Sequence, residues 1–172
     1  MGDDGLGKEA ETRIREWLDV PLEGYSFDRI PDQMTGYYMV SRNICDFHCY
    51  KYPEMYYIES KATWSDRFDF SMLSDTQYKG LLKKSMIPGC HGLVIVLFAT
   101  QQIAVILDIR DIHHLMEKKN KKSVNVKKLG AWNIPYAQIK TVPSRKKLLN
   151  YEGSFQELVN ELEQMRSTFD YS

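Results

Sequence analysis

Two carboxylates and one lysine stand at a spacing suited to metal-assisted hydrolysis. Asp46 lies in the run NICDF, and Glu59 and Lys61 lie in YYIESKAT. Residues two apart in a strand point to the same face, so Glu59 and Lys61 should project together, and Asp46 reaches the same end if the two runs form a hairpin. Charged groups on an apolar strand are costly to bury unless they are paired or bound to metal. Their position therefore needs a reason.

The chemistry that fits this trio is phosphodiester hydrolysis. Two carboxylates can hold Mg²⁺ through hard oxygen ligands and leave coordination positions for water and a phosphate. A lysine can orient or activate the attacking water and oppose the charge that develops on the phosphate. The alternative is an exposed edge hairpin on which Glu59 and Lys61 form the solvent face, because triplets of this kind also arise by chance.

Two further polar residues could join the trio. Glu11 lies on a predicted opening helix and could reach a metal site. Gln77 begins a later predicted helix, where its side chain could contact the scissile phosphate or its water. Each is a candidate catalytic residue.

The elements that must position these residues follow from the hydrophobic periodicity. Apolar spacing predicts helices over residues 8–18, 74–86 and 108–116, and a closing helix over 154–166 that opens with a capping-box pattern. Extended segments are predicted over 37–40, 44–50 and 55–63, with 44–63 forming a hairpin. The apolar runs 92–99 and 103–107 predict strands buried on both faces, and 21–35 is predicted to be loop.

Composition places the chain among ordinary globular proteins. It has 172 residues, of which 43% are hydrophobic and 27% charged, and we expect a single α/β domain over 1–172 with helix 154–166 appended to its core. Gln101 and Gln102 interrupt the longest apolar stretch, so no membrane span is predicted. A polar N-terminal run and three cysteines without framework spacing favour a reduced, cytoplasmic protein.

The formal net charge of zero conceals a segregation. Ten of the 23 basic residues lie within segment 118–147, which has no acidic residue, so the remainder holds 13 basic against 23 acidic residues. A segment of one sign suggests a polyanionic partner, whereas the alternative is a solubilising loop. The candidate DNA-binding residues in it are Lys121, Lys122, Lys127 and Lys128.

These motifs together resemble the PD-(D/E)xK nuclease superfamily, and within it the RecU-type Holliday junction resolvases of Gram-positive bacteria and their phages. The likeness includes GKEAETRI around Glu11, the thirteen positions from Asp46 to Glu59 in an E-S-K triplet, and FDFSMLSDTQYKGL around Gln77. GLVIVLF and the KKS of residues 121–123 extend it to roughly residues 7–135. Ser60 replaces the alanine of the family's E-A-K.

The resemblance implies a restriction-endonuclease-like fold, a mixed central sheet flanked by helices. It also implies a Mg²⁺-dependent homodimer, with Mn²⁺ as a substitute ion, that cuts four-way DNA junctions by paired nicks in a bacterial cell or phage-infected host. Asp46 and Glu59 would bind metal, Lys61 would be the catalytic lysine, and Glu11 and Gln77 would assist. The family's basic stalk before the aspartate is short here and offers only Arg29 and Arg42 for DNA.

Two other functions remain open at this stage. One is another nuclease of the same superfamily, of nicking or restriction type. The other is a DNA-binding protein that keeps the sheet but does not cut. The presence of Glu11, Asp46, Glu59 and Lys61 together favours an active enzyme.

Other residues offer competing interpretations. Asp32 follows Pro31 as in the superfamily's namesake dipeptide, but it lies in predicted loop, so Asp46 is preferred. Cys45, His48, Cys49 and the Cys90-His91 pair could be assembled into a zinc site, although alternation along a strand puts Cys45 and Cys49 on one side and His48 on the other. His113 and His114 are expected to be a surface pair at a helix end.

The aromatic residues near the triplet are expected to be mostly strand packing, although Trp64 could serve DNA. For the homodimer interface, the candidates are segments 37–40 and 56–58, with the closing helix as a lesser possibility.

Overall fold

The computed structural model describes residues 3–31, 43–144 and 149–172. Asp32, segment 37–40 and Arg42, all discussed above, lie outside these ranges, as do Arg145, Lys146 and Lys147 at the end of segment 118–147. The expectations for them stay predictions.

Seven strands form one mixed sheet. Their order across it is β1 (Tyr25–Arg29), β2 (Phe47–Lys51), β3 (Glu54–Thr63), β5 (Cys90–Phe98), β6 (Ile103–Asp108), β8 (Ala137–Val142) and β9 (Asn150–Glu152). Among these described strands, β3 and β5 pair in parallel and the other neighbours pair antiparallel. A two-stranded ribbon pairs β4 (Arg67–Asp69) with β7 (Ser123–Asn125).

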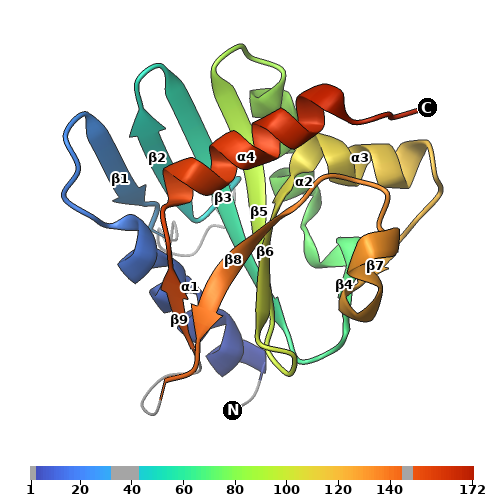
Figure 1. The fold of residues 1–172 in the computed structure, drawn as a ribbon, viewed down its shortest axis with the longest axis horizontal. Helices are drawn as coiled ribbons and strands as arrows, with labels where there is room; N and C mark the ends of the chain where they lie inside the picture. The colour runs from blue at the N-terminus through green and yellow to red at the C-terminus, as the bar shows by residue number, and fades with distance from the viewer. Residues whose placement is uncertain (1–2, 32–42, 145–148) are drawn as a thin grey trace, which may run out of the picture.

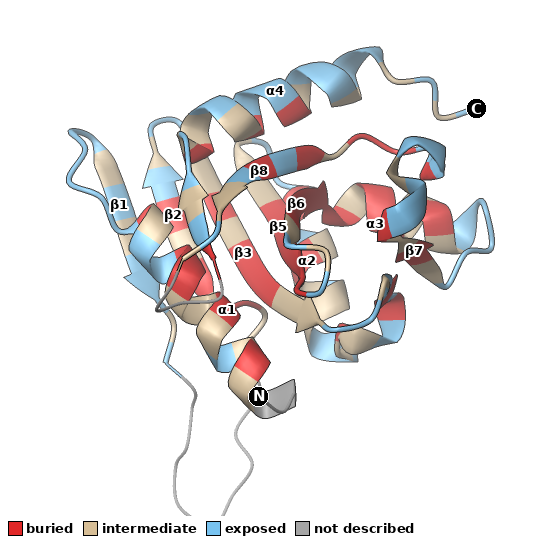
Figure 2. Cartoon of the chain, turned by 60° about the horizontal axis from the view of Figure 1, so that its bottom comes forward, coloured by how far each residue is buried: buried red, intermediate tan, exposed pale blue. Residues whose placement is uncertain are grey.

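Helices cover both faces of the sheet (Figure 1). α1 (Asp3–Leu18) and α4 (Phe155–Thr168) share one core cluster with the side chains of one face, and α2 (Asp75–Ser85) and α3 (Ile109–Glu117) share a second cluster with the other face. Both faces of β5 and β6 are therefore covered, which explains their nearly continuous apolar sequences. Figure 2 shows the buried positions gathered along β3, β5 and β6.

The predicted α/β class, a mixed central sheet flanked by helices, is confirmed. Each helix predicted from periodicity is present, as are the strands predicted over 55–63, 92–99 and 103–107 and the hairpin that joins β2 to β3. No helix in the described ranges is both long and apolar enough to cross a membrane.

The prediction of loop over 21–35 is wrong in part, because β1 lies inside it. Tyr25 and Phe27 pack against the core, whereas Ser26 and Asp28 are exposed. β1 is an edge strand with one covered face, and its pairing with β2 holds it in the sheet. A short alternation of this kind next to Gly24 is easily mistaken for loop.

The basic segment, residues 118–147, is folded over most of its described part and is not a plain loop. β7, the 3₁₀ turn η2 (Val126–Ala131) and β8 occupy it. Val124, Val126 and Trp132 are buried in the second core cluster, and the lysines between them are exposed. The lysines therefore stand on a scaffold that is anchored to the core.

The closing helix α4 begins at a capped residue and packs on the sheet. Ser154 Oγ accepts a hydrogen bond from the backbone N–H of Glu157. Phe155, Val159 and Leu162 are buried in the first core cluster, whereas Met165, one turn further along, is 39% exposed. The buried stripe of α4 therefore ends at Leu162.

Candidate active site

The candidate site lies where β2 and β3 part. The first ladder pair of β2 is Phe47 opposite Ile58, and the N–H of Asp46 still donates to the carbonyl of Ile58 at 3.0 Å. Beyond this point β2 has ended, and the N–H of Ser60 would face no strand. Asp46 Oδ2 accepts from it at 2.8 Å. Asp46 therefore lies just before β2 and not on a strand, which corrects the expectation from the sequence, and its carboxylate takes the place of the missing ladder partner.

Glu59 and Lys61 project together from β3, as strand alternation predicts. Their neighbour Ile58 packs in the α1 cluster and Tyr57 in the α2 cluster, so Glu59 and Lys61 lie on the α2 face. Glu59 is only 2% exposed. Lys61 Nζ lies 3.1 Å from Glu59 Oε2.

Gln77 is held by the first turn of α2 and reaches Glu59. Ser74 is the N-cap, and the two residues bond reciprocally in a capping box, which fixes the Gln77 side chain. The Gln77 amide Nε2 then donates to Glu59 Oε2 at 2.8 Å. Gln77 thus supports the carboxylate directly.

Two glycines that sequence reasoning missed set the place of α2. A Cβ on Gly80 would lie 2.3 Å from Ile44 Cγ2, so only glycine lets the segment before Asp46 pack directly on the helix. A Cβ on Gly92 in β5 would lie 2.6 Å from the carbonyl oxygen of Leu81. The signal was present in the sequence, since a lone glycine inside a helical pattern often has a packing reason.

Glu59 is an under-satisfied buried acid. Its Oε2 receives Gln77 and Lys61, but its Oε1 is buried and has no hydrogen-bond partner among the described residues. Burial raises the pKa of the Glu59 carboxyl to about 9, the charge of Asp46 adds to the rise, and Lys61 opposes it. A cation beside the two carboxylates would supply what this arrangement lacks.

The donor set suits a hard divalent ion. Asp46 and Glu59 offer carboxylate oxygens, the ligands that Mg²⁺ prefers, and Mg²⁺ is usually bound by one or two carboxylates while it keeps several waters. No group of three or more His, Cys, Asp or Glu side chains within the described ranges could hold a metal by itself. The chain thus offers two carboxylates, and water or phosphate oxygens would complete the coordination.

Comparisons with known proteins leave the chain without a family. No family model matches it, and no curated protein matches it. Among solved structures, it is similar to the Holliday junction resolvase Hjc of the archaeal hyperthermophile Archaeoglobus fulgidus, with 13% identity and a TM-score of 0.38 over 60% of this chain and 77% of that one. A match at this level assigns neither a family nor an activity.

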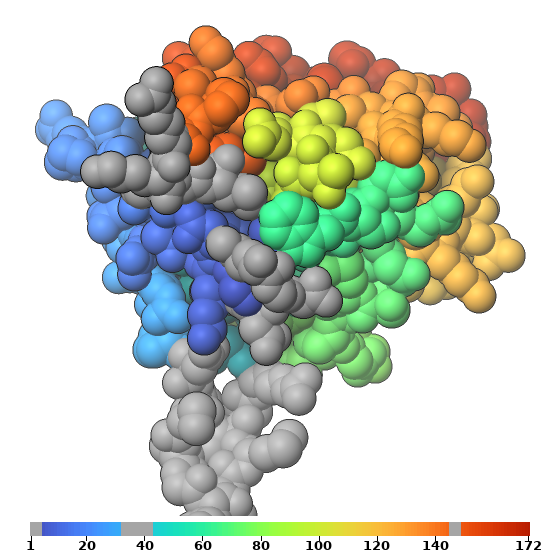
Figure 3. Space-filling model, turned by 90° about the horizontal axis from the view of Figure 1, so that it is seen from below, coloured from blue at the N-terminus to red at the C-terminus, as the bar shows by residue number. Residues whose placement is uncertain are grey.

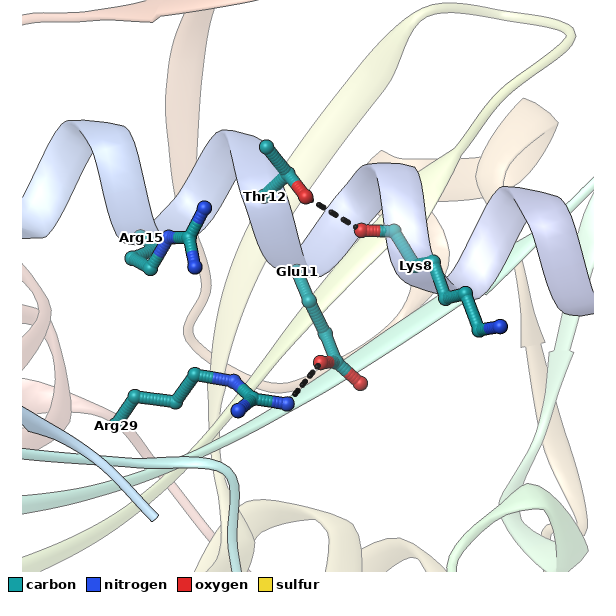
Figure 4. A pocket seen from close by; sticks show the side chains of 5 residues that line it. All are labelled: Lys8, Glu11, Thr12, Arg15 and Arg29. Atoms are coloured by element: carbon teal, nitrogen blue, oxygen red, sulfur yellow. Dashed lines mark hydrogen bonds and ion pairs between the residues drawn. The ribbon is translucent and has the colours of Figure 1, made fainter. Parts of the chain in front are cut away.

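Glu11 lies in a separate pocket on the α1 side of the sheet (Figure 4). The pocket has a volume of about 300 Å³ and is lined by Lys8, Glu11, Thr12, Arg15 and Arg29. Glu11 Oε2 lies 3.9 Å from the Arg29 guanidinium. Arg29 is paired across the ladder with Phe47, which packs towards α1, whereas Glu59 faces α2. This pocket is still close to the β2–β3 fork, the point beside Asp46 where the two strands part, because the N–H of Ile30 donates to the carbonyl of Asp46. The role of Glu11 in catalysis stays a prediction.

The four candidate DNA-binding lysines surround the β4–β7 ribbon. Lys121, Lys122, Lys127 and Lys128 are exposed, and Lys127 Nζ lies 3.5 Å from Asp66. A pocket of about 430 Å³ is lined by Lys121 and Lys122 together with Tyr78, and Asp69 and Asp75 line it as well. Tyr78 follows Gln77, so the first turn of α2 separates this pocket from Glu59.

Three other expectations are corrected. His113 and His114 lie within α3 and are half-buried; His113 Nδ1 bonds the Tyr78 hydroxyl at 2.5 Å, and His114 packs edge-on to Tyr171.

Segment 56–58 cannot be a dimer interface through Tyr56 and Ile58, because both are buried, and Phe155 of α4 covers Tyr56. Cys45 and Cys49 were expected on one side of a strand, but they belong to different core clusters on opposite faces of the sheet, so one zinc ion could not bind both.

Proposed function

We propose that this protein is a magnesium-dependent DNA endonuclease that resolves four-way junctions by paired nicks. The observation that carries the proposal is the meeting of Asp46, Glu59 and Lys61 at the β2–β3 fork, with one buried Glu59 oxygen free to bind a cation. The junction as substrate follows from the resemblance of the D-x₁₂-E-S-K motif and its neighbours to RecU-type resolvases.

The chain's own residues would divide the work of hydrolysis. Asp46 and Glu59 would hold the ion, which supplies positive charge beside the scissile phosphate and lowers the pKa of a bound water. Lys61 would place its ammonium against a phosphate oxygen or the attacking water. In the reaction the water oxygen bonds to phosphorus, the P–O bond to one sugar breaks, and the departing oxygen gains a proton.

Gln77 and Ser60 would hold the two carboxylates in position. The Gln77 amide fixes the Glu59 carboxylate, and the Ser60 N–H fixes that of Asp46. Both donors sit on regular elements, the first turn of α2 and strand β3, which hold side chains more firmly than a loop does. Catalysis depends on such placement, because small misplacements of reacting groups reduce rates steeply.

The exposed lysines would bind the phosphate backbone. Each phosphate neutralised releases counterions, which gives a slope of about −0.9 per contact in log affinity against log salt for duplex DNA. Replacing Lys121, Lys122, Lys127 and Lys128 with Glu should weaken DNA binding and flatten this slope. An unchanged slope would show that the lysines only solubilise the surface.

A homodimer would match the substrate. One site hydrolyses one strand, whereas resolving a four-way junction requires cuts at two symmetry-related positions. A two-fold dimer supplies both sites from one chain. Light scattering with and without junction DNA tests this, and a 20 kDa species that still makes paired nicks would contradict it.

The deciding experiment is cleavage of labelled four-way junction, fork and duplex DNA of the same sequence. With Mg²⁺ or Mn²⁺ the wild-type protein should cut the junction in paired strands, and Glu59→Gln should bind it without cutting. Cutting that is confined to single nicks in duplex would identify a nicking enzyme. Junction binding without any cleavage would identify a DNA-binding protein.

A further inference from the structure

The three tryptophans of this chain have different environments. Trp17 donates from its indole N–H to the carbonyl of Gly153 at 2.9 Å and packs edge-on to Tyr151 and Phe155. Trp132 is 5% exposed, and its indole N–H donates to the carbonyl of Asn125 at 2.7 Å. Trp64 is 37% exposed, and within the described part of the chain its indole makes neither a hydrogen bond nor an aromatic contact. A buried or half-buried indole normally finds a partner for its N–H.

Trp64 lies at the end of the strand that carries the catalytic residues. It directly follows β3, three residues after Lys61, which in extended chain is about 10 Å. In the view from below, this end of β3 lies in the middle of the face, between α1 and the turn that joins β5 to β6 (Figure 3). One strand of duplex DNA rises about 3.4 Å per nucleotide, so a strand whose phosphate reached Lys61 would bring a base within about three nucleotides to this distance.

The backbone at Trp64 is firmly held. Its carbonyl accepts from Thr100 Oγ1 at 2.7 Å, and the carbonyl of Thr63 accepts from the N–H of Ala99 at 2.9 Å. On the other side, the N–H of Ser65 donates to Thr63 Oγ1 at 3.0 Å. The ring is therefore presented on a fixed backbone, which lowers the entropy cost of binding a ligand to it.

An exposed cation follows Trp64 along the chain. Arg67 lies three residues later, at the start of β4, and its guanidinium donates to Ser123 Oγ at 3.1 Å. Aromatic rings next to cations that track a backbone are the pattern by which proteins hold unpaired bases.

We propose that Trp64 stacks on a nucleobase that has lost its stacking neighbour at the branch point of the DNA, beside the scissile phosphate. This inference rests on the proposed nuclease function, and it makes Trp64 the residue that favours branched over continuous DNA. In a continuous duplex both faces of each base are covered by neighbouring bases. At an exchange point a base face is open, and an indole can cover it.

The test compares Trp64→Ala, Trp64→Leu and Trp64→Phe in a Glu59→Gln background, so that DNA is bound and not cut. Losing one base–aromatic stack should weaken junction affinity by roughly 5- to 150-fold in the Ala and Leu variants. Duplex affinity should change little, and Trp64→Phe should keep most of the junction preference because it keeps a π-face. Tyr52→Ala is the matched control, since Tyr52 is 79% exposed at the far end of the β2–β3 hairpin.

A second readout separates stacking from packing. Adding junction DNA should quench tryptophan fluorescence in the Glu59→Gln protein, and Trp64→Phe should abolish that quench. If Trp64→Ala fails to fold, the Leu and Phe variants decide the matter, because they fill similar space and differ in the ring.

Failure of the nuclease proposal and failure of the stacking proposal give different results. If the wild-type protein cuts no DNA, the nuclease proposal is wrong, and the quench still reports whether Trp64 meets a base. If the wild-type protein cuts junctions and all three variants bind junction and duplex as Glu59→Gln alone does, with the quench intact in Trp64→Phe, the stacking role is overturned.

Discussion

Two groups of buried acids in this fold have their hydrogen-bonding capacity met to different degrees. One is an ion-pair network formed by Glu54, His91, Asp108, Arg110, Asp111, Glu163 and Arg166. Asp108 and Asp111 are fully buried in it, and each receives two side-chain hydrogen bonds from an arginine. In the other group, at the β2–β3 fork, Glu59 is nearly as deeply buried, yet one of its oxygens has no hydrogen-bond partner among the described residues.

The contrast distinguishes acids whose partners are all supplied by the fold from an acid that the fold leaves with an unpartnered oxygen. Buried polar groups in folded proteins are almost always hydrogen-bonded, so an exception needs an explanation. In the network, Arg110 of α3 and Arg166 of α4 supply the hydrogen bonds that the buried carboxylates require. The fork has one lysine for two carboxylates, and the deficit of positive charge is what a metal ion would fill.

The sharpest way to break this contrast is Glu59→Gln. We expect cleavage to fall on the order of 10³-fold or more, because a ligand that supports metal binding is lost. Stability of the metal-free protein should not fall, because the raised pKa keeps the Glu59 carboxyl protonated near neutral pH and the amide is equally neutral. Gel-based cleavage and urea unfolding measure the two effects.

Asp46→Asn should show the same separation of activity from stability. Its comparison is Asp32→Asn, which should cut normally. If the two results are exchanged, the metal ligand is Asp32 and the assignment of Asp46 is wrong.

Asp111→Ala should do the reverse, with stability lost and the chemistry kept. It leaves Arg166 without its main partner in a site that is largely closed to water, and removing one member of a buried pair costs about 3 kcal/mol of unfolding free energy. Activity per folded molecule should be unchanged. Glu152→Gln, which breaks the exposed pair with Lys140, is the control and should stay within about 0.5 kcal/mol.

Gly80→Ala should disturb the fork from a distance. The new methyl group would push Ile44, and with it the segment that carries Asp46, at a strain cost of about 1–3 kcal/mol. We expect kcat to fall by roughly 10- to 100-fold, and Ile44→Ala should restore part of it. Gly7→Ala, which would meet nothing within 4 Å, should leave both quantities unchanged or slightly raise stability. Equal losses in both glycine variants would contradict this account.

The smallest expected effect is a pH dependence in the network. Burial lowers the pKa of the His91 ring, but hydrogen bonds and charges from Glu163 and Glu54 outweigh it and raise the pKa above 6.5. His91 therefore stabilises the fold below pH 6.5, and this contribution is lost as pH rises through the higher folded-state pKa. Urea unfolding of His91→Gln against its parent, both carrying Glu59→Gln, should show a difference that shrinks as pH rises above 6.5. A constant difference would mean that His91 does not titrate in this window.

The core of the candidate site could be predicted because it depends on local rules. Strand alternation placed Glu59 beside Lys61, and a hairpin brought Asp46 to them. The capping residue Ser74 fixed where α2 begins and therefore where Gln77 stands.

The rest depends on contacts between distant segments, which periodicity does not encode. The Gly80–Ile44 packing and the partners of His91 appear only when α2 and α4 are placed on the sheet. Segment 56–58 was misjudged for the same reason, since its aromatic sequence gives no sign that α4 covers it. β1 was missed because an edge strand with one covered face carries a weak hydrophobic pattern.

The parallel pairing of β3 with β5 also decides how the site could be transplanted. A hairpin alone brings Asp46 to Glu59 and Lys61, but Gln77 arrives only through the crossover that leads from β3 to β5. Asp46, Glu59, Lys61 and Gln77, together with both packing glycines, lie between Asn43 and Phe98. A designer who wished to graft this chemistry onto another sheet would need that whole continuous stretch, and a shorter graft would carry the acids without the helix that holds them in place.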